Sequence, residues 1–320
     1  MSYSVNGKFL FSGNNITKLP TSLYIFAKAG QLEEIDLSNN QIEEDSLKRI
    51  YFKSLTSLKI LNLSRNANIS SINYSVFKDT QLQNLNMSSV NLKNLNKLGS
   101  KNLTILDLSQ NSISLIPEDT FEDLENLELL NLGNNKISEL QTNVFSSLKK
   151  LTKLILNCNV ICDIPKGIFK DLSNLVTLDL SYNSLEYIEG LDKLNKLQDL
   201  KLQGNYLKVI PSNNELPNSL LKLDISDNPL IFLGRNTFSN LGNLISLDIS
   251  YTNNSYIKST FEPLRSLKVL RMHHNNLYNL EDIFFPYKLE RLELEFNNLT
   301  GVVYKGLETT CSGNYQRSML

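Results

Sequence analysis

Apolar residues recur along most of the chain in one fixed order. Two aliphatic residues separated by one residue, L-x-L, are followed by x-x-N, a second apolar stretch and F-x-x-L. Between Leu103 and Leu175 this order passes three times, and the anchors Leu103, Leu127, Leu151 and Leu175 are each 24 residues apart. Alternation at L-x-L places both aliphatic side chains on one face of a short strand. Each repeat therefore predicts one strand and one return loop.

Extending the register in both directions predicts about thirteen such coils. A consensus asparagine follows most of the strands, whereas Val90 and Thr252 take its place in two coils. A buried asparagine amide can bond backbone groups of adjacent turns, so we expect slight irregularity where it is missing. The consensus asparagines are Asn14, Asn40, Asn66, Asn111, Asn135, Asn159, Asn183, Asn205, Asn228, Asn275 and Asn297.

The repeated pattern predicts an α/β solenoid in place of a globular domain. No single coil can bury its own apolar edge, so neighbouring coils must stack. The stack would be a curved, right-handed horseshoe with a parallel sheet on its concave face and irregular or 3-10 loops on its convex face. The apolar spacing of residues 43–55 favours one or two helical turns on the convex side.

One domain, 1–320, accounts for the whole pattern. Residues 1–31 form a degenerate first coil, residues 32–300 form the regular coils, and residues 301–320 are expected to be a frayed or incomplete end. Capping units with clustered cysteines are missing from both ends, and the first residues lack the pattern of a secretory signal. We therefore expect either a protein that is not secreted or an excerpt of a longer chain, and favour the excerpt.

Composition excludes several classes of protein. The formal net charge is −1, so no global basic field indicates nucleic acid. No apolar run approaches the roughly 18 residues that a membrane span requires. Cys158, Cys162 and Cys311 predict free thiols, because a bridge between the first two would close a very small loop. We found no catalytic motif, no metal-ligand set and no cofactor motif, and so expect no enzyme, no metal and no cofactor.

The pattern L-x-x-L-x-L-x-x-N-x-L-x-x-[IL]-P-x-x-x-F-x-x-L, as in residues 103–124 and 151–172, resembles the typical class of extracellular leucine-rich repeats. Coils of 24 residues with shorter and longer members are most similar to Toll-like receptor ectodomains. The resemblance implies a glycosylated innate immune receptor that binds a protein or other macromolecular ligand and dimerises around it. It would lie outside the cell or in the endosomal lumen.

Two alternatives remain open at this stage. One is a cytoplasmic leucine-rich-repeat scaffold or regulatory subunit, which the unpaired cysteines favour. The other is the substrate-recognition part of a larger enzyme such as a ubiquitin ligase.

Asparagine-x-serine/threonine motifs occur at eight positions. With 42 asparagines and 50 serines and threonines, chance gives about six or seven, so the number is not evidence of secretion. Asn62 and Asn86 would lie within strands of the concave face, where a glycan would block binding. The remaining glycosylation candidates are Asn15, Asn68, Asn73, Asn102, Asn253 and Asn298.

The candidate binding residues lie on the strands of the last three coils. Charges of both signs and aromatic side chains gather there, and aromatic and arginine residues on an exposed face are typical of binding hot spots. Lateral pairing of opposite charges is the structural alternative. The adjacent histidines also raise the hypothesis of a contact gated by pH. The candidates are Tyr251, Lys268, Arg271, His273, His274, Arg291, Glu293 and Phe296.

Overall fold

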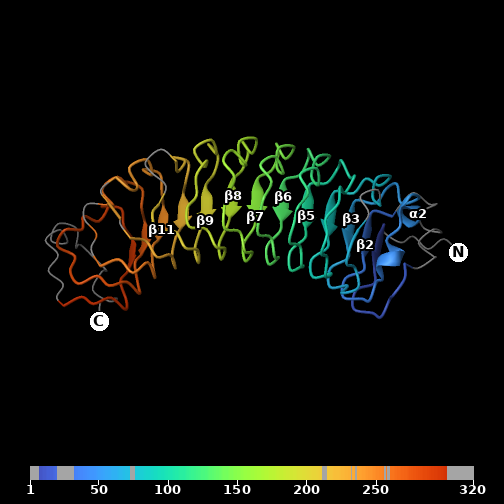
Figure 1. Cartoon of the computed structure of the whole chain (residues 1–320), viewed down its shortest axis with the longest axis horizontal. Helices are drawn as coiled ribbons and strands as arrows, with labels where there is room; N and C mark the ends of the chain where they lie inside the picture. Colours follow the sequence, from blue (N-terminus) through green and yellow to red (C-terminus); the bar gives the residue numbers. More distant parts are fainter. Residues whose placement is uncertain are drawn as a thin grey trace.

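The computed structural model describes residues 7–19, 32–72, 76–210, 215–231, 233–234, 236–255, 257 and 260–300. In this part of the chain, thirteen strands form one parallel sheet in strictly sequential order. The coils stack side by side into an arc that runs from the N-terminal to the C-terminal end (Figure 1). The expected solenoid with its sheet on the concave face is confirmed.

Each strand contains three residues. The strands are β1 Lys8–Leu10, β2 Glu34–Asp36, β3 Ile60–Asn62, β4 Asn84–Asn86, β5 Ile105–Asp107, β6 Leu129–Asn131, β7 Lys153–Ile155, β8 Thr177–Asp179, β9 Asp199–Lys201, β10 Lys222–Asp224, β11 Ser246–Asp248, β12 Val269–Arg271 and β13 Arg291–Glu293.

The core is a set of parallel ladders built from equivalent positions of successive coils. The central residue of β2 to β12 is buried, as Leu130 and Leu154 illustrate, whereas its two neighbours on the strand are partly or fully exposed. Phenylalanines of the return loops stack on one another, with 6.2 Å between the ring centroids of Phe121 and Phe145. The L-x-L pattern and the recurring phenylalanine therefore both mark the core, as predicted.

The convex side contains two short helical segments. These are η1, Glu44–Ser46, and α2, Arg49–Phe52, and both lie in the segment whose spacing predicts helical turns. Phe52 is buried against Phe77 of the next coil. On the outside, the guanidinium of Arg49 donates two hydrogen bonds to the Asp79 carboxylate, at 2.7 and 3.0 Å. The helical segment is thus attached to the following coil by both apolar and ionic contacts.

Consensus asparagines connect each coil to the one before it. In Asn135, Nδ2 donates to the carbonyls of Leu132 in its own coil and Leu108 in the preceding coil, both at 3.0 Å. Its Oδ1 accepts from the amide of Ile113, again in the preceding coil, at 3.1 Å. Equivalent bonds recur at most consensus positions, so one side chain satisfies backbone groups of two coils.

The two coils without the asparagine satisfy their backbone differently. At Val90 the amide of Ile69 in the preceding coil donates to the Val90 carbonyl at 3.3 Å, and Oδ1 of Asn111 in the next coil accepts from the amides of both Val90 and Leu92, at 3.0 and 2.9 Å. At Thr252 the hydroxyl donates to the Ile249 carbonyl and accepts from Nδ2 of the buried Asn254. The expected irregularity is therefore a local change of hydrogen bonding, and the sheet continues through both coils.

This bonding predicts unequal costs for removing two consensus asparagines. Asn111→Ala leaves the buried amides of Val90 and Leu92 without their acceptor, so we expect a loss of about 3 kcal/mol or more of unfolding free energy. Asn14 is exposed and, among the described residues, donates only to carbonyls of its own coil, so Asn14→Ala should cost less than about 1 kcal/mol. Urea unfolding followed by circular dichroism measures both. Equal losses would mean that the inter-coil bonds contribute little.

Candidate functional site

The end of each strand is a tight turn. The last strand residue is often aspartate or asparagine, and its Oδ1 accepts from the amide two residues later, as in Asp224 to Ser226 at 3.1 Å. The residue that follows has a left-handed backbone, with φ of 55° at Tyr251 and 53° at His274. We call this residue, which directly precedes the consensus asparagine slot, the edge position.

Repetition places the edge side chains of adjacent coils next to one another. Tyr251, His274 and Phe296 occupy the edge positions of the last three coils and form a continuous stack, which we call the C-terminal aromatic stack. Ring centroids are 4.2 Å apart both between Tyr251 and His274 and between His274 and Phe296, with interplanar angles of 14° and 27°. Tyr251 is 50% exposed and Phe296 is 75% exposed. The stack therefore presents a large aromatic surface to solvent.

Charged residues of β12 and β13 lie beside the stack and pair with one another. The Arg271 guanidinium is 3.3 Å from the Glu293 carboxylate and 4.0 Å from that of Asp248. Arg291 contacts Glu293 at 2.6 Å, and Lys268 contacts Glu290 at 2.8 Å. The expected lateral pairing is therefore present, and it leaves the aromatic rings as the main uncompensated feature of this surface.

The two histidines link the charged network to the stack. Nδ1 of His273 lies 2.9 Å from Nδ1 of His274, and Nε2 of His273 lies 3.9 Å from the Glu293 carboxylate. His273 also meets Tyr251 edge to face, with 5.4 Å between ring centroids. All eight candidate residues from the sequence thus lie on the last three coils. We refer to them together as the C-terminal patch.

Asp224 borders the C-terminal patch and is mostly buried. Burial raises the pKa of this carboxyl above its ordinary value, and the nearby Asp248 carboxylate adds to the effect. Hydrogen bonds from the amide and hydroxyl of Ser226 and the charge of Arg271 act in the opposite direction. The ionised form is therefore destabilised in the folded protein.

Three of the six glycosylation candidates occupy the same position in their coils. Asn15, Asn253 and Asn298 each directly follow a consensus slot, and all three are exposed, as is Asn68. Asn102 is half-buried and donates a hydrogen bond to Gln81 at 2.8 Å, whereas Asn73 lies outside the described residues.

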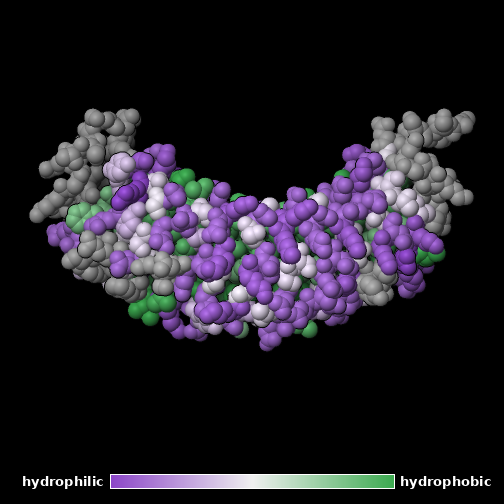
Figure 2. Space-filling view, turned by 90° about the horizontal axis from the view of Figure 1, so that it is seen from above, coloured by the Kyte–Doolittle hydropathy of each residue, from purple (hydrophilic) through white to green (hydrophobic). Residues whose placement is uncertain are grey.

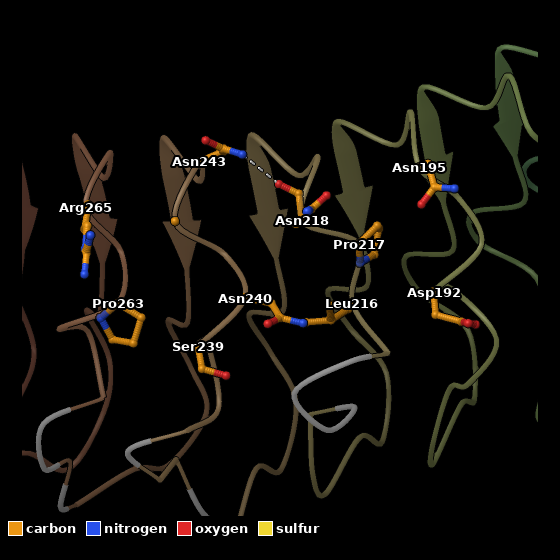
Figure 3. Close-up of a pocket in the computed structure, with 11 residues that line it drawn as sticks. Asp192, Asn195, Leu216, Pro217, Asn218, Ser239, Asn240, Asn243, Pro263 and Arg265 are labelled. Atoms are coloured by element: carbon orange, nitrogen blue, oxygen red, sulfur yellow. Dashed lines mark hydrogen bonds between the residues drawn. The ribbon is translucent and has the colours of Figure 1, made fainter.

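A hollow of about 580 Å³ lies on the coil segments that lead into β9 to β12. Figure 3 shows Asn195, Asn218 and Asn243 along successive coils, with a hydrogen bond from Asn243 to the Asn218 carbonyl at 3.0 Å. The hollow is lined mainly by amide and hydroxyl groups, together with Asp192 and Arg265. The face shown in Figure 2 is likewise mainly hydrophilic, with small scattered hydrophobic spots.

Further expectations concern cysteines, metals and membranes. Cys158 is half-buried and Cys162 is exposed, and both are free thiols, whereas Cys311 lies outside the described residues. Within the described ranges, no three histidine, cysteine or acidic side chains are grouped so that they could bind a metal ion. No helix in that part of the chain is long and apolar enough to cross a membrane.

The leucine-rich-repeat family model matches residues 30–92, 101–161, 149–207 and 218–277, which together are more than half of the chain. The chain belongs to the leucine-rich repeat family. This agrees with the thirteen-stranded sequential sheet and with the resemblance that the repeat pattern carries.

Curated relatives match part of this leucine-rich repeat protein. Keratocan of Mus musculus is 35% identical over 115 residues, 35% of this chain and 32% of the relative. Toll-like receptor 13 of Mus musculus is 40% identical over 96 residues, 28% of this chain and 10% of the receptor. Tsukushi-A of Xenopus laevis is 32% identical over 139 residues, 41% of this chain and 39% of the relative. The alignments thus span a minor part of each relative.

Solved structures match over most of the chain. The crystal structure of the TLR13–ssRNA13 complex superposes with a TM-score of 0.77 and 30% identity, covering 88% of this chain and 42% of that one. The structure of the Drosophila Toll–Spätzle complex has the same TM-score of 0.77 at 22% identity, covering 91% of this chain and 45% of that one. The protein is therefore a leucine-rich-repeat recognition module similar to Toll-like receptor ectodomains.

The raised pKa of Asp224 predicts a pH-dependent effect of Asp224→Asn. A raised folded-state pKa means that the stabilising contribution of this carboxyl is complete below its unfolded pKa and is lost as pH rises through the folded pKa. Asparagine keeps the acceptor for the Ser226 amide, as Asn62 does for Ser64. We therefore expect Asp224→Asn to be at least as stable as wild type at pH 7.

The same reasoning gives the sign of the pH trend. The stability of the variant relative to wild type should decrease as pH falls from 7 to 4, because wild type regains the contribution of its protonated carboxyl. Urea unfolding at several pH values measures this difference. A variant whose relative stability increases toward acid pH would contradict the assignment.

Proposed function

We propose that this chain is part of the ligand-binding ectodomain of a Toll-like innate immune receptor, and that its C-terminal patch binds a protein ligand. The observation that carries the proposal is the C-terminal aromatic stack, because exposed aromatic side chains dominate binding energy at protein interfaces. The likeness to Toll-like receptor 13 and to Toll supports the receptor assignment. We further propose that the chain lies outside the cell or in the endosomal lumen and dimerises around its ligand.

The charges of the concave face favour a protein over a nucleic acid. Asp179, Asp224 and Asp248 end strands β8, β10 and β11 of the concave sheet, where their carboxylates would repel a phosphate backbone. Arg271 and Arg291 are already paired with Glu293. The solved TLR13–ssRNA13 complex nevertheless contains a single-stranded RNA, so binding of RNA by this chain is the outcome that would overturn this part of the proposal.

A cytoplasmic scaffold is the second candidate, since Cys158 and Cys162 are free thiols and disulfides are typical of secreted proteins. Expression behind a secretion leader distinguishes the two by mass analysis of the exported chain. Glycans at the exposed Asn253 or Asn298 on a folded, exported protein support the receptor, whereas failure to fold in the secretory pathway supports the scaffold.

The test of ligand binding compares a double variant in the C-terminal aromatic stack with a control variant of an exposed tyrosine elsewhere. Tyr251→Ala/Phe296→Ala removes both exposed ends of the stack and should weaken binding of a secreted protein ligand by about 2 kcal/mol or more. Tyr206→Ala removes a tyrosine of similar exposure, 58%, that lies outside the C-terminal patch and should leave affinity unchanged. Biolayer interferometry against a panel of purified secreted proteins and a mixed-sequence single-stranded RNA measures the affinities. Equal effects of both variants, or binding of the RNA alone, would contradict the proposal.

The hypothesis of a contact gated by pH rests on the position of the histidine pair within this surface. Imidazole side chains in general change charge between about pH 5 and 8, and His273 faces Glu293 and Tyr251 while His274 lies between two aromatic rings. We expect the ratio of ligand affinities at pH 5.5 and pH 7.4 to differ from one in wild type and to approach one in His273→Ala/His274→Ala. An unchanged ratio in the double variant would show that other groups cause the pH dependence.

A further inference from the structure

A second hollow lies on the concave face, at the carboxyl ends of β2 to β5. Its volume is about 380 Å³, and its lining includes Ser38, Ser64, Arg65, Ser88 and Asp107. The hollow is far along the arc from the C-terminal patch, because seven strands, β4 to β10, separate β3 from β11. Nothing in the proposed function uses these residues.

Two serines of this hollow, Ser64 and Ser88, follow strands that end in asparagine, whereas Ser109 of the same hollow follows an aspartate. A serine hydroxyl without a partner among the described residues also occurs at Ser250, so the asparagines are what distinguishes this hollow. Where a strand ends in aspartate, the serine two residues later commonly donates its hydroxyl to that carboxylate, as Ser181 does to Asp179 at 2.6 Å and Ser226 does to Asp224 at 2.7 Å. Strands β3 and β4 end in Asn62 and Asn86 instead.

Asparagine changes what these serines can bond. Oδ1 of Asn62 accepts from the Ser64 amide at 3.1 Å, and Oδ1 of Asn86 accepts from the Ser88 amide at 2.9 Å. This bonding fixes the orientation of both amides, so each Nδ2 is a donor that points away from the turn. The Ser64 and Ser88 hydroxyls have no acceptor among the described residues, although Ser64 is only 9% exposed.

Arg65 adds an uncompensated positive charge. It occupies the edge position of its coil, with φ of 58°, and is exposed. Among the described residues it makes no ion pair, in contrast to Arg271 and Arg291, which both contact Glu293. A guanidinium beside free hydroxyl and amide donors is the donor set that recognises a tetrahedral oxyanion.

One carboxylate also lines the hollow. Oδ1 of Asp107 accepts from both the amide and the hydroxyl of Ser109, at 2.9 and 2.6 Å. These two bonds hold the carboxylate against its own turn at β5, whereas the free donors belong to β3 and β4. An anion is therefore favoured on the β3–β4 side of the hollow.

We propose that this hollow is an oxyanion subsite that binds one phosphate or sulfate group, with Arg65 as the charged donor and Ser64 and Ser88 as neutral donors. Asn86 lines the hollow and contributes its Nδ2 group, and Asn62, the equivalent residue of β3, places an amide where other strands have a carboxylate. Both asparagines also lie in glycosylation acceptor motifs, and the proposal requires both to be unmodified because a glycan there would fill the hollow.

The test measures binding of inorganic phosphate and inorganic sulfate by isothermal titration calorimetry, with chloride at equal ionic strength as the control. Arg65→Gln removes the charge, and the same left-handed position already accommodates glutamine in Gln110, so the fold should be kept. We expect Arg65→Gln to weaken oxyanion binding about tenfold or more, Arg65→Lys to restore part of it, and Ser64→Ala/Ser88→Ala to weaken it several-fold. Lys153→Gln, which removes an exposed positive charge on β7 outside both the hollow and the C-terminal patch, should have no effect.

Binding of glycerol 3-phosphate and of N-acetylglucosamine 6-sulfate then distinguishes a phosphate ester from a sulfated sugar as the source of the group. Tighter binding of either compound identifies that source. Binding no stronger than chloride, equal binding by Arg65→Gln, or a glycan on Asn62 or Asn86 of the exported chain would overturn the proposal. These outcomes are independent of whether the C-terminal patch binds a protein, because the variants at Arg65 and at Tyr251 lie on different coils.

Discussion

The buried asparagine amide is the interaction on which the rest of the structure depends. A stack of short coils has few backbone hydrogen bonds within each coil, since every described strand contains three residues and, apart from η1 and α2, the rest of the described backbone forms turns and loops. One amide that donates to two carbonyls and accepts from an amide of the preceding coil satisfies several of these groups at once. Because each bond joins two coils, it also fixes their register, so equivalent residues repeat along the arc at constant spacing.

Constant register converts a single sequence position into a row of adjacent side chains. The edge position illustrates this, because its backbone conformation is the same in nearly every coil whereas its side chain varies freely. Three aromatic residues in succession, Tyr251, His274 and Phe296, become a stack without any dedicated pocket. Arg65 at the same position near the other end becomes an isolated positive charge beside small polar side chains. The two ends of one concave face thus acquire different chemistry from one backbone geometry.

The strands and the core could be predicted from the sequence, because they depend on local alternation and on a period that is constant in the regular coils. Leu103, Leu127 and Leu151 lie in the core as expected, and so do the phenylalanines in step with them. Tyr251 and Phe296 could be chosen as candidates by residue type, but their stacking with His274 was not foreseen. The signal was present, since all three directly precede a consensus slot. To predict the stacking from that signal, one must also know that the position before the consensus slot has a left-handed backbone.

The second hollow, at the carboxyl ends of β2 to β5, could not be recognised from the sequence, because it depends on serine hydroxyls that have no acceptor among the described residues. Asn62 and Asn86 resemble ordinary members of the strand pattern until their amides are seen to bond the serine backbone and to leave the serine hydroxyls free. The aspartates of other coils show the opposite situation, in which Asp179 and Asp224 accept from both amide and hydroxyl. Carboxylates committed in this way to turns are poor candidates for proton transfer. The side chains that retain unsatisfied bonding capacity, Arg65 and its neighbouring serines, are therefore the ones on which the proposed oxyanion subsite depends.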